Sequence, residues 1–311
     1  MASKVQPKLP IIDFSKENLK PGSSNWLSTA QEVQRALEEY GAFAIKAYDK
    51  MPSELHDAMF ELAKGLFDLP EEIKAKNTSA IKGFGHDGNF KTMLVEYFGI
   101  HDGGTPQGIQ RFTNLMWPAG NHAFAETTLL YARKLSEIGK IAVLMAFESY
   151  GAEKYYNAHL ESVEFLMRFL KYPRPSNDHV KTGLHYHVDK GFWAILDQNQ
   201  VKGLQIETKN GEWLTFEPSP STFVFVAGEA FVAWSNGRIH PCLHRVMADE
   251  NATKYSIGLF AFANGIVEVP QELVDDERPL RFKPFDHYSF LHYCLDEGRN
   301  LTNAINTYCG V

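Results

Sequence analysis

The second half of the sequence is a succession of short runs rich in β-branched and aromatic residues, broken at intervals by turn residues. These runs are expected to be strands and cover residues 165–172, 183–189, 192–196, 203–207, 213–217, 223–226, 231–234, 243–248 and 255–260. Many short strands without intervening helices favour a double-sheet barrel or jelly roll. The Lys209-Asn210-Gly211 tripeptide between two of the runs is typical of a hairpin turn.

The first half of the chain carries the apolar spacing of helices. Residues 25–40 have apolar side chains at helical intervals, and Gly41 is expected to end that helix. Residues 42–45 are predicted to be a short buried strand. A second helix is predicted over residues 53–66, with Ser53 as its cap.

The remaining segments complete an α+β fold. Residues 77–118 are rich in Gly, Asn and Asp and are expected to form irregular loops. Residues 124–149 return to apolar spacing of three and four, which predicts a long packed helix, and a last helix is expected over 285–297. We therefore expect an α-rich part, residues 1–150, packed on a double-stranded β-helix (jelly-roll) core with a C-terminal helix, residues 151–311, as one functional unit.

Charge and composition argue against several partners. A net charge of -7 without a dense cluster of Lys and Arg disfavours nucleic acid. No run approaches the roughly 20 apolar residues of a membrane span, and the first residues lack a long apolar region, so a cytoplasmic location is expected. The three cysteines, Cys242, Cys294 and Cys309, are widely spaced and favour neither disulfides nor a thiolate zinc site. A monomer that binds a small molecule is expected.

Three residues have the chemistry and spacing of a metal centre. His187 and Asp189 are two apart on a predicted strand, so their side chains share one face. His244 lies on another predicted strand downstream. Two His and one carboxylate with open positions suit Fe(II) that must also accept O₂ and a cosubstrate. A lone His-x-Asp is weak evidence among 12 histidines, but the order that continues through Lys254 and Ser256 is harder to obtain by chance.

These residues and their surroundings resemble the plant 2-oxoglutarate/Fe(II)-dependent dioxygenases, and within them the AOP-type clade named for glucosinolate side-chain oxidation. The similarity extends over nearly the whole chain. Matching segments are residues 10–14 (PIIDF), 66–70 (LFDLP), 112–118 (FTNLMWP), 170–173 (LKYP), 234–238 (WSNGR), 244–246 (HRV), 255–260 (YSIGLF) and 282–287 (FKPFDH).

The resemblance implies an oxidoreductase in which His187, Asp189 and His244 bind Fe(II). Such an enzyme consumes 2-oxoglutarate and O₂, releases succinate and CO₂, and abstracts hydrogen from a C-H bond; ascorbate would stimulate it. The expected substrate is a small plant specialised metabolite. Hydroxylation is the expected outcome, and desaturation, ring closure and dealkylation remain open because they begin with the same abstraction.

The cosubstrate site departs from the family pattern. The family's Arg-x-Ser, which holds the far carboxylate of 2-oxoglutarate, falls on Lys254 and Ser256. The family's Asn-Tyr-Tyr-Pro motif is replaced by LKYP at residues 170–173. This segment keeps Tyr172, which can donate a hydrogen bond to the cosubstrate. The planar guanidinium of arginine donates two parallel hydrogen bonds to a carboxylate, whereas the ammonium of lysine is a single point charge on a flexible chain. We expect weakened but real 2-oxoglutarate binding, with a loss of about 1.5 to 3 kcal/mol.

Substrate contacts are sought near the motif and in the last helix. His185 is two residues before His187, so it is expected to share that strand face and enter the pocket, although a structural role is the alternative. Aromatic candidates for the substrate pocket, each of which could equally be core packing, are Phe192, Trp193, Phe285 and Phe290.

Three other functions compete with this interpretation. A catalytically decayed metabolite- or iron-binding protein of the same fold would explain the loss of arginine at Lys254. Zinc-dependent hydrolysis would use the same two His and one carboxylate. An ascorbate-using oxidase would need no 2-oxoglutarate. Metal analysis together with a succinate assay separates these alternatives.

Overall fold

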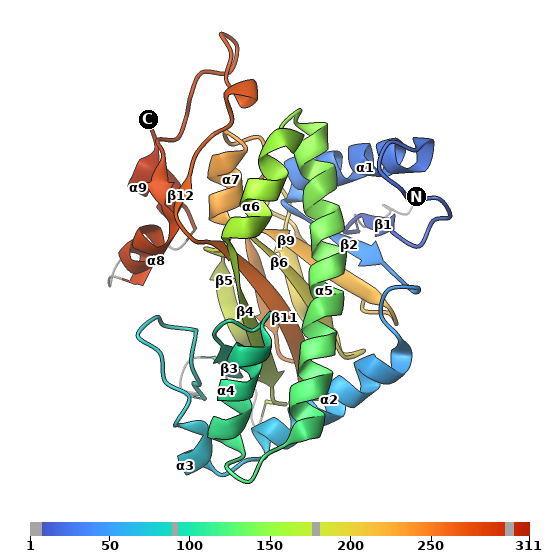
Figure 1. Ribbon diagram of the computed structural model, residues 1–311, viewed down its shortest axis with the longest axis vertical. Helices are drawn as coiled ribbons and strands as arrows, with labels where there is room; N and C mark the ends of the chain where they lie inside the picture. The colour runs from blue at the N-terminus through green and yellow to red at the C-terminus, as the bar shows by residue number, and fades with distance from the viewer. Residues whose placement is uncertain (1–7, 89–92, 176–180, 296–301) are drawn as a thin grey trace, which may run out of the picture.

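The computed structural model describes residues 8–88, 93–175, 181–295 and 302–311. Its core is two β-sheets (Figure 1), and residues of both sheets line a pocket. Apart from the parallel pair β1 and β2, the strands of both sheets pair antiparallel, as a jelly roll requires. The larger sheet has the order β1 (Ile11–Asp13), β2 (Ala42–Lys46), β9 (Thr222–Ala227), β6 (Trp193–Gln198), β11 (Lys254–Ala263), β4 (Val163–Tyr172) and β3 (Glu96–Ile100).

The smaller sheet carries two of the predicted metal ligands. Its order is β5 (Thr182–His187), β10 (His244–Met247), β7 (Leu204–Glu207) and β8 (Trp213–Thr215). The predicted hairpin turn joins β7 to β8, and Gly211 in that turn has φ +79°, a left-handed conformation that glycine adopts without strain. A third, two-stranded sheet pairs β12 (Ile266–Val267) with β13 (Phe285–Asp286). The α+β jelly-roll prediction is confirmed.

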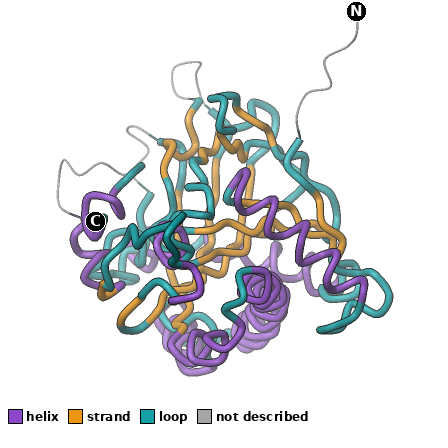
Figure 2. The backbone as a smooth tube through the Cα atoms, turned by 90° about the horizontal axis from the view of Figure 1, so that it is seen from above, coloured by secondary structure: helices purple, strands orange, loops and turns teal. Residues whose placement is uncertain are grey.

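Several helices, the longest among them, lie on one side of the large sheet (Figure 2), whereas Leu291 of the helix at 287–295 packs on its other face with Phe260 and Phe262. Among the described residues, no helix has the length and apolar character needed to cross a bilayer. The helices are α1 (Ser24–Tyr40), α2 (Ser53–Phe67), α3 (Glu71–Lys74), α4 (Pro106–Met116), α5 (His122–Ser149), α6 (Tyr156–Ser162), α7 (Glu229–Trp234), α8 (His287–Leu295) and α9 (Ala304–Cys309), with 3-10 turns at Glu153–Tyr155 and Gln271–Leu273.

Close packing of α5 on the large sheet builds the main core. A Cβ added to Gly139 of α5 would lie 2.4 Å from the ring of Trp193, so only glycine allows this approach. Phe124 of the same helix packs on Phe169 of β4 with ring centroids 5.9 Å apart. The predicted long helix over residues 124–149 is therefore present, and its buried stripe covers one face of β4 and β6.

The first helix begins and ends where the sequence indicates. The Ser23 hydroxyl accepts a hydrogen bond from the backbone N-H of Trp26, which satisfies one of the free donors of the first turn. Gly41 ends the helix with φ +66°, and a Cβ there would lie 2.1 Å from the carbonyl oxygen of His240. The chain then enters β2 directly, so the region predicted to be α-rich also supplies strands to the large sheet. The boundary near residue 150 stays a prediction.

Several local predictions are wrong. Residues 231–234 were expected to be a strand but lie in α7, because a short apolar run has no periodicity that separates helix from strand. Within the expected loop 77–118 the chain forms β3 and α4; Thr105 caps α4, and Pro106 occupies its first turn. Ser53 does not cap α2, whose N-cap is Pro52.

The C-terminal part also differs in detail from the prediction. The last predicted helix, 285–297, is observed as α8, and its expected end at residues 296–297 lies outside the described residues. A further short helix, α9, follows. Strand β5 ends at His187, so Asp189 lies just beyond the strand on which it was predicted.

Candidate metal centre and cosubstrate pocket

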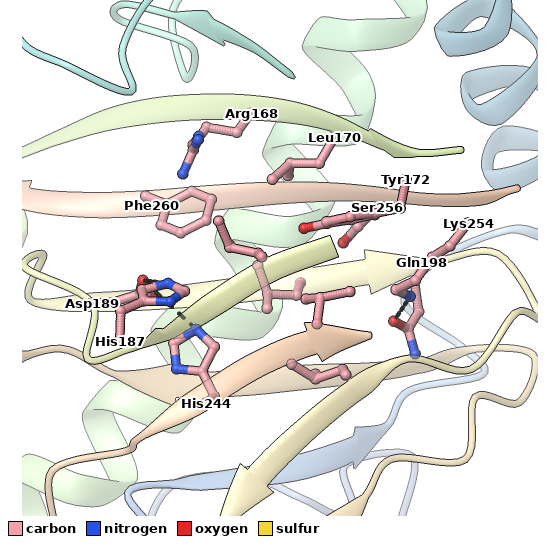
Figure 3. Close-up of a pocket in the computed structure, with 14 residues that line it drawn as sticks. Arg168, Leu170, Tyr172, His187, Asp189, Gln198, His244, Lys254, Ser256 and Phe260 are labelled. Carbon is pink, nitrogen blue, oxygen red and sulfur yellow. Dashed lines mark hydrogen bonds and ion pairs between the residues drawn. The ribbon is translucent and has the colours of Figure 1, made fainter. Parts of the chain in front are cut away.

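A pocket between the two sheets contains the predicted metal ligands at one end and Lys254 at the other (Figure 3). Strands β4, β6 and β11 form one wall, and β5, β7 and β10 form the opposite wall. The lining residues are Arg168, Leu170, Tyr172, Leu184, His187, Asp189, Leu196, Gln198, Leu204, His244, Val246, Lys254, Ser256 and Phe260.

The three predicted ligands converge on one point. His187 ends β5 and His244 begins β10, and the two residues are register partners in the small sheet. Asp189 Oδ1 lies 3.4 Å from His187 Nε2 and 3.8 Å from His244 Nε2. One ligand atom from each residue lies within 4.8 Å of the other two. Ligands held about 2 Å from a common ion are separated by distances of this order, so one metal ion can contact all three.

Hydrogen bonds orient both imidazoles toward that point. His187 Nδ1 donates to the His185 carbonyl oxygen at 2.7 Å, and His244 Nδ1 donates to the Cys242 carbonyl oxygen at 3.0 Å. Because a carbonyl oxygen only accepts, each bond requires the proton on Nδ1. In the neutral ring this leaves the Nε2 lone pair on the side of Asp189, which is the tautomer that a metal-binding histidine needs.

The protonation states suit a cation. Burial lowers the pKa of His244 to about 4, so this imidazole is neutral near pH 7. Burial raises the pKa of Asp189, but His244 and His187 lower it by more, and the carboxyl is ionised. Its Oδ2 atom is buried and has no hydrogen-bond partner among the described residues. A buried carboxylate oxygen without a partner beside two imidazole lone pairs fits a divalent cation.

Lys254, Ser256 and Tyr172 meet at the other end of the pocket. Lys254 is 1% exposed, and its ammonium donates to Gln198 Oε1 and, at 3.3 Å, to the Val201 carbonyl oxygen. Burial lowers the pKa of Lys254 to about 7, although Asp197 opposes that shift. Ser256 Oγ donates to the Asp197 carbonyl oxygen at 3.0 Å. Tyr172 is the register partner of Lys254 on β4, so the predicted cosubstrate residues are neighbours.

Phe192 and Trp193 lie away from the pocket. Each is 1% exposed. The Phe192 ring stacks on Phe231 with centroids 4.6 Å apart, and the Trp193 ring stacks on Phe225 at 5.9 Å. Both belong to the core between the large sheet and its helices. Their sequence position just after the metal motif therefore does not make them pocket residues.

Phe285 and Phe290 also lie in the core. Their rings pack edge to face with centroids 5.8 Å apart, and both contact Tyr308 in the C-terminal helix α9. Neither lines the pocket between the sheets. The aromatic side chain that does line it is Phe260 of β11, together with Tyr172.

His185 points outward because β5 contains a bulge. The register pairs His244 with His187 and Val246 with Leu184, so two steps along β10 match three steps along β5. The extra residue reverses the alternation of side chains. Leu184 and His187 consequently both line the pocket, whereas His185 is exposed and Tyr186 is 57% exposed.

Two polar pocket residues were not singled out from the sequence. Arg168 lies on β4 at an even spacing from Tyr172, and Gln198 ends β6 opposite Ser256 in the register. Alternation along β4 could have placed Arg168 on the face of Tyr172. The position of Gln198 in the pocket depends on the pairing of β6 with β11, and no local sequence pattern predicts that pairing.

Two family models match this chain. Residues 163–263 match the 2OG-Fe(II) oxygenase superfamily, and residues 9–113 match the model of the non-haem dioxygenase in morphine synthesis N-terminal region. The chain is 39% identical over 297 residues to a probable 2-oxoglutarate-dependent dioxygenase AOP1 of Arabidopsis thaliana, covering 93% of this chain and 97% of that relative. It is 30% identical to the 2-oxoglutarate-dependent dioxygenase AOP3 of the same plant, covering 98% of each.

Solved structures agree with the fold. A rice dioxygenase for auxin oxidation superposes with a TM-score of 0.83 at 25% identity, over 98% of this chain and 100% of that one. JOX2 in complex with 2OG, Fe and JA superposes with a TM-score of 0.81 at 20% identity, over 97% and 89%. At that identity the likeness to JOX2 concerns the fold alone.

Proposed function

The chain belongs to the 2-oxoglutarate- and Fe(II)-dependent dioxygenases, and from this premise we propose that His187, Asp189 and His244 hold its iron. The observation that carries the proposal is the convergence of two oriented Nε2 lone pairs on a carboxylate whose Oδ2 has no partner. We propose further that 2-oxoglutarate extends from the iron toward Lys254, where Ser256 and Tyr172 also contact it.

Each side chain has a separate task in this proposal. Bound iron supplies the centre at which 2-oxoglutarate and O₂ react. Asp189 neutralises part of the metal charge, while the backbone carbonyls behind His187 and His244 fix both imidazole rings. The ammonium of Lys254 attracts the far carboxylate of 2-oxoglutarate inside a buried site, where water screens it weakly.

The substrate proposed is a small organic molecule, oxidised at a C-H bond. The apolar side chains of Leu170, Leu184 and Phe260 line the pocket and suit an apolar substrate body. The rice structure, which is 25% identical, is named for auxin oxidation. Hydroxylation is the expected outcome, and the monomeric state and cytoplasmic location stay predictions for size-exclusion chromatography and for localisation of a tagged chain.

The decayed-enzyme alternative is not favoured. A site released from selection for turnover has no reason to keep three converging ligands together with the hydrogen bonds that orient them. Lys254 still presents a cation to the pocket in place of arginine. Zinc-dependent hydrolysis and a 2-oxoglutarate-independent oxidase lose support because the chain's family consumes 2-oxoglutarate with Fe(II).

The test combines turnover with binding. The protein is incubated with Fe(II), 2-oxoglutarate, ascorbate and a plant metabolite extract under ¹⁸O₂, and mass spectrometry searches for products that gain one labelled oxygen or lose two hydrogens. Succinate that rises with such a product supports the proposal, and Asp189→Ala is the matched inactive control. A protein that binds iron but shows neither the visible absorption of the 2-oxoglutarate chelate without O₂ nor succinate with O₂ would contradict it.

A further inference from the structure

Arg168 is a cation in the pocket that the cosubstrate site does not use. It extends from β4 into the space between the sheets, on the side of His187 and Asp189 and away from Lys254 (Figure 3). The pocket thus has a cationic side chain toward each end, and 2-oxoglutarate bound toward Lys254 leaves the one beside the metal ligands free.

Two aromatic rings hold the guanidinium of Arg168. Its Cζ atom lies 4.8 Å from the ring centroid of Tyr97 and 5.6 Å from that of Phe260. Contacts of this kind satisfy the flat faces of a guanidinium through cation-π attraction but leave its N-H groups without acceptors. The group is positioned in advance, so little side-chain entropy remains to be lost when an acceptor arrives.

The edge of the guanidinium lacks such an acceptor. Arg168 Nε is buried without a hydrogen-bond partner, and among the described residues no carboxylate lies within ion-pair distance of the side chain. A buried charged donor that stays unpaired is costly, so an anion entering the pocket gains the full strength of the contact.

We propose that Arg168 binds a carboxylate on the organic substrate and so determines which C-H bond faces the iron. This inference rests on the proposed function, since it assigns 2-oxoglutarate to the Lys254 end. The planar fork of arginine matches a carboxylate with two parallel hydrogen bonds. Phe260, which packs against the guanidinium, also lines the pocket and offers an apolar surface beside the charge. The substrate class is therefore a small monocarboxylic acid with an apolar body.

The test compares acids with their uncharged amides. The protein loaded with Fe(II) and 2-oxoglutarate, without O₂, is titrated calorimetrically with four pairs: phenylacetate, 3-phenylpropanoate, 4-phenylbutanoate and indole-3-acetate, each against its primary amide. At least one acid is expected to bind about 10- to 100-fold more tightly than its amide, the range of a charge-assisted hydrogen bond. Arg168→Met should abolish that preference, and Arg168→Lys should restore part of it because it keeps the charge without the fork.

Arg238→Met is the matched control. Arg238 is also half-buried, lies 5.8 Å from the ring centroid of Tyr150, and has an Nε atom without a partner, but it does not line the pocket. Its variant should keep the preference for the acid. The proposal is overturned if no acid binds more tightly than its amide, or if Arg168→Met weakens the binding of 2-oxoglutarate and leaves the binding of the acid unchanged. If the wild-type protein forms no 2-oxoglutarate chelate, the proposed function itself is contradicted, and this outcome is distinct from a failure of the Arg168 proposal.

A different observation concerns Gln198. Its Oε1 accepts from the Lys254 ammonium, which fixes the orientation of the amide, and its Nε2 is buried without a partner. Gln198 lines the pocket and is the register partner of Ser256. We infer that Gln198 Nε2 donates to the far carboxylate of 2-oxoglutarate, so that the Gln198 amide and the Lys254 ammonium together replace the two-pronged donor of the family's arginine.

Two keto acids separate this contact from chelation. 2-Oxoglutarate and 2-oxopentanoate have the same metal-binding group, but only the first has a far carboxylate. Gln198→Leu should raise the Kd of 2-oxoglutarate about tenfold and leave that of 2-oxopentanoate unchanged, as followed by the visible absorption of the anaerobic chelate. Gln205→Leu on β7, outside the pocket, is the control. Equal changes for both keto acids, or no change for either, would overturn the inference.

Discussion

The two faces of β6 meet very different surroundings. Trp193, Ile195 and Asp197 point toward the helices, where rings pack closely and the Asp197 carboxylate accepts from Tyr131 Oη at 2.5 Å and from the Gln198 backbone N-H at 2.8 Å. Leu196 and Gln198 point into the pocket, where Gln198 Nε2 has no partner. Alternate residues of one strand therefore serve stability on one face and binding on the other. On the first face the Asp197 carboxylate has its hydrogen-bond partners, although Trp193 Nε1 has none, and on the second face Gln198 Nε2 is left without one.

The largest effect is expected from Asp189→Ala, on the pocket face. Loss of the carboxylate should reduce 2-oxoglutarate turnover by about three orders of magnitude or more, as removal of a central catalytic group does. The metal-free variant should melt no earlier than the wild type, because a buried carboxylate with an unpartnered oxygen is removed. Succinate formation and thermal unfolding measure the two effects. Turnover within tenfold of the wild type would contradict the assigned ligand.

On the helix face, Trp193→Ala should mainly cost stability. The indole is 1% exposed and fills the space left by Gly139, so its loss should reduce the free energy of unfolding by about 3 to 5 kcal/mol. Denaturant titration measures this. Leu196→Ala, on the half-buried pocket face, is the matched comparison and should cost clearly less. Equal losses in the free energy of unfolding for the two variants would contradict the proposed difference between the two faces of β6.

The affinity for 2-oxoglutarate should depend on pH because the pKa of Lys254, unlike that of an exposed lysine, lies near neutrality. Burial lowers the pKa of Lys254 to about 7, so the ammonium is present below pH 7 and is lost above it. Only the ammonium attracts a carboxylate, so affinity for 2-oxoglutarate should fall as pH rises, about fivefold between pH 7 and 8. Anaerobic titration of the chelate measures the affinity.

Lys254→Arg is the control for that pH dependence, because a guanidinium stays protonated throughout this range. Its affinity for 2-oxoglutarate should be constant between pH 7 and 8 and, if the fork fits, higher than that of the wild type. A wild-type affinity that does not change with pH, or an Arg variant that changes as much as the wild type, would remove Lys254 from the cosubstrate site.

The smallest effect is expected from His185→Ala. This side chain is exposed on the outer side of the bulge, so stability should change by less than about 0.5 kcal/mol and turnover by less than about twofold. The backbone carbonyl that accepts from His187 remains in the variant. A large loss of activity would mean that His185 reaches the substrate after all.

Long helices with regular apolar spacing were predicted well from the sequence. The stripe of α5 and the glycine that ends α1 depend on local chemistry, so residues 24–40 and 122–149 were recognised within two residues at each end, whereas the Ser23 cap of α1 was not predicted. The order of His187, Asp189 and His244 along the chain predicted that these distant side chains converge, and the structure does bring them together. These features need no knowledge of how strands pair.

Features that depend on pairing were missed. The bulge in β5 places His185 outside, although strict alternation puts it beside His187. Phe192 and Trp193 were assigned to the pocket because only the pairing of β6 with β9 and β11 decides which face meets α5. Residues 96–100 are a strand because they complete the edge of the large sheet against β4, whereas their Gly- and Asn-rich surroundings suggest loops.

The backbone of β5 also makes the proposed metal centre more sensitive to chain length than to side-chain identity. Substitutions at His185 or Tyr186 change only groups that face solvent. Deleting either residue would leave Leu184 and His187 two residues apart, so regular alternation would still direct both into the pocket, but it would change the backbone carbonyl group that orients the His187 ring. Along this stretch, natural variants should therefore exchange residues more freely than they change the length of the chain.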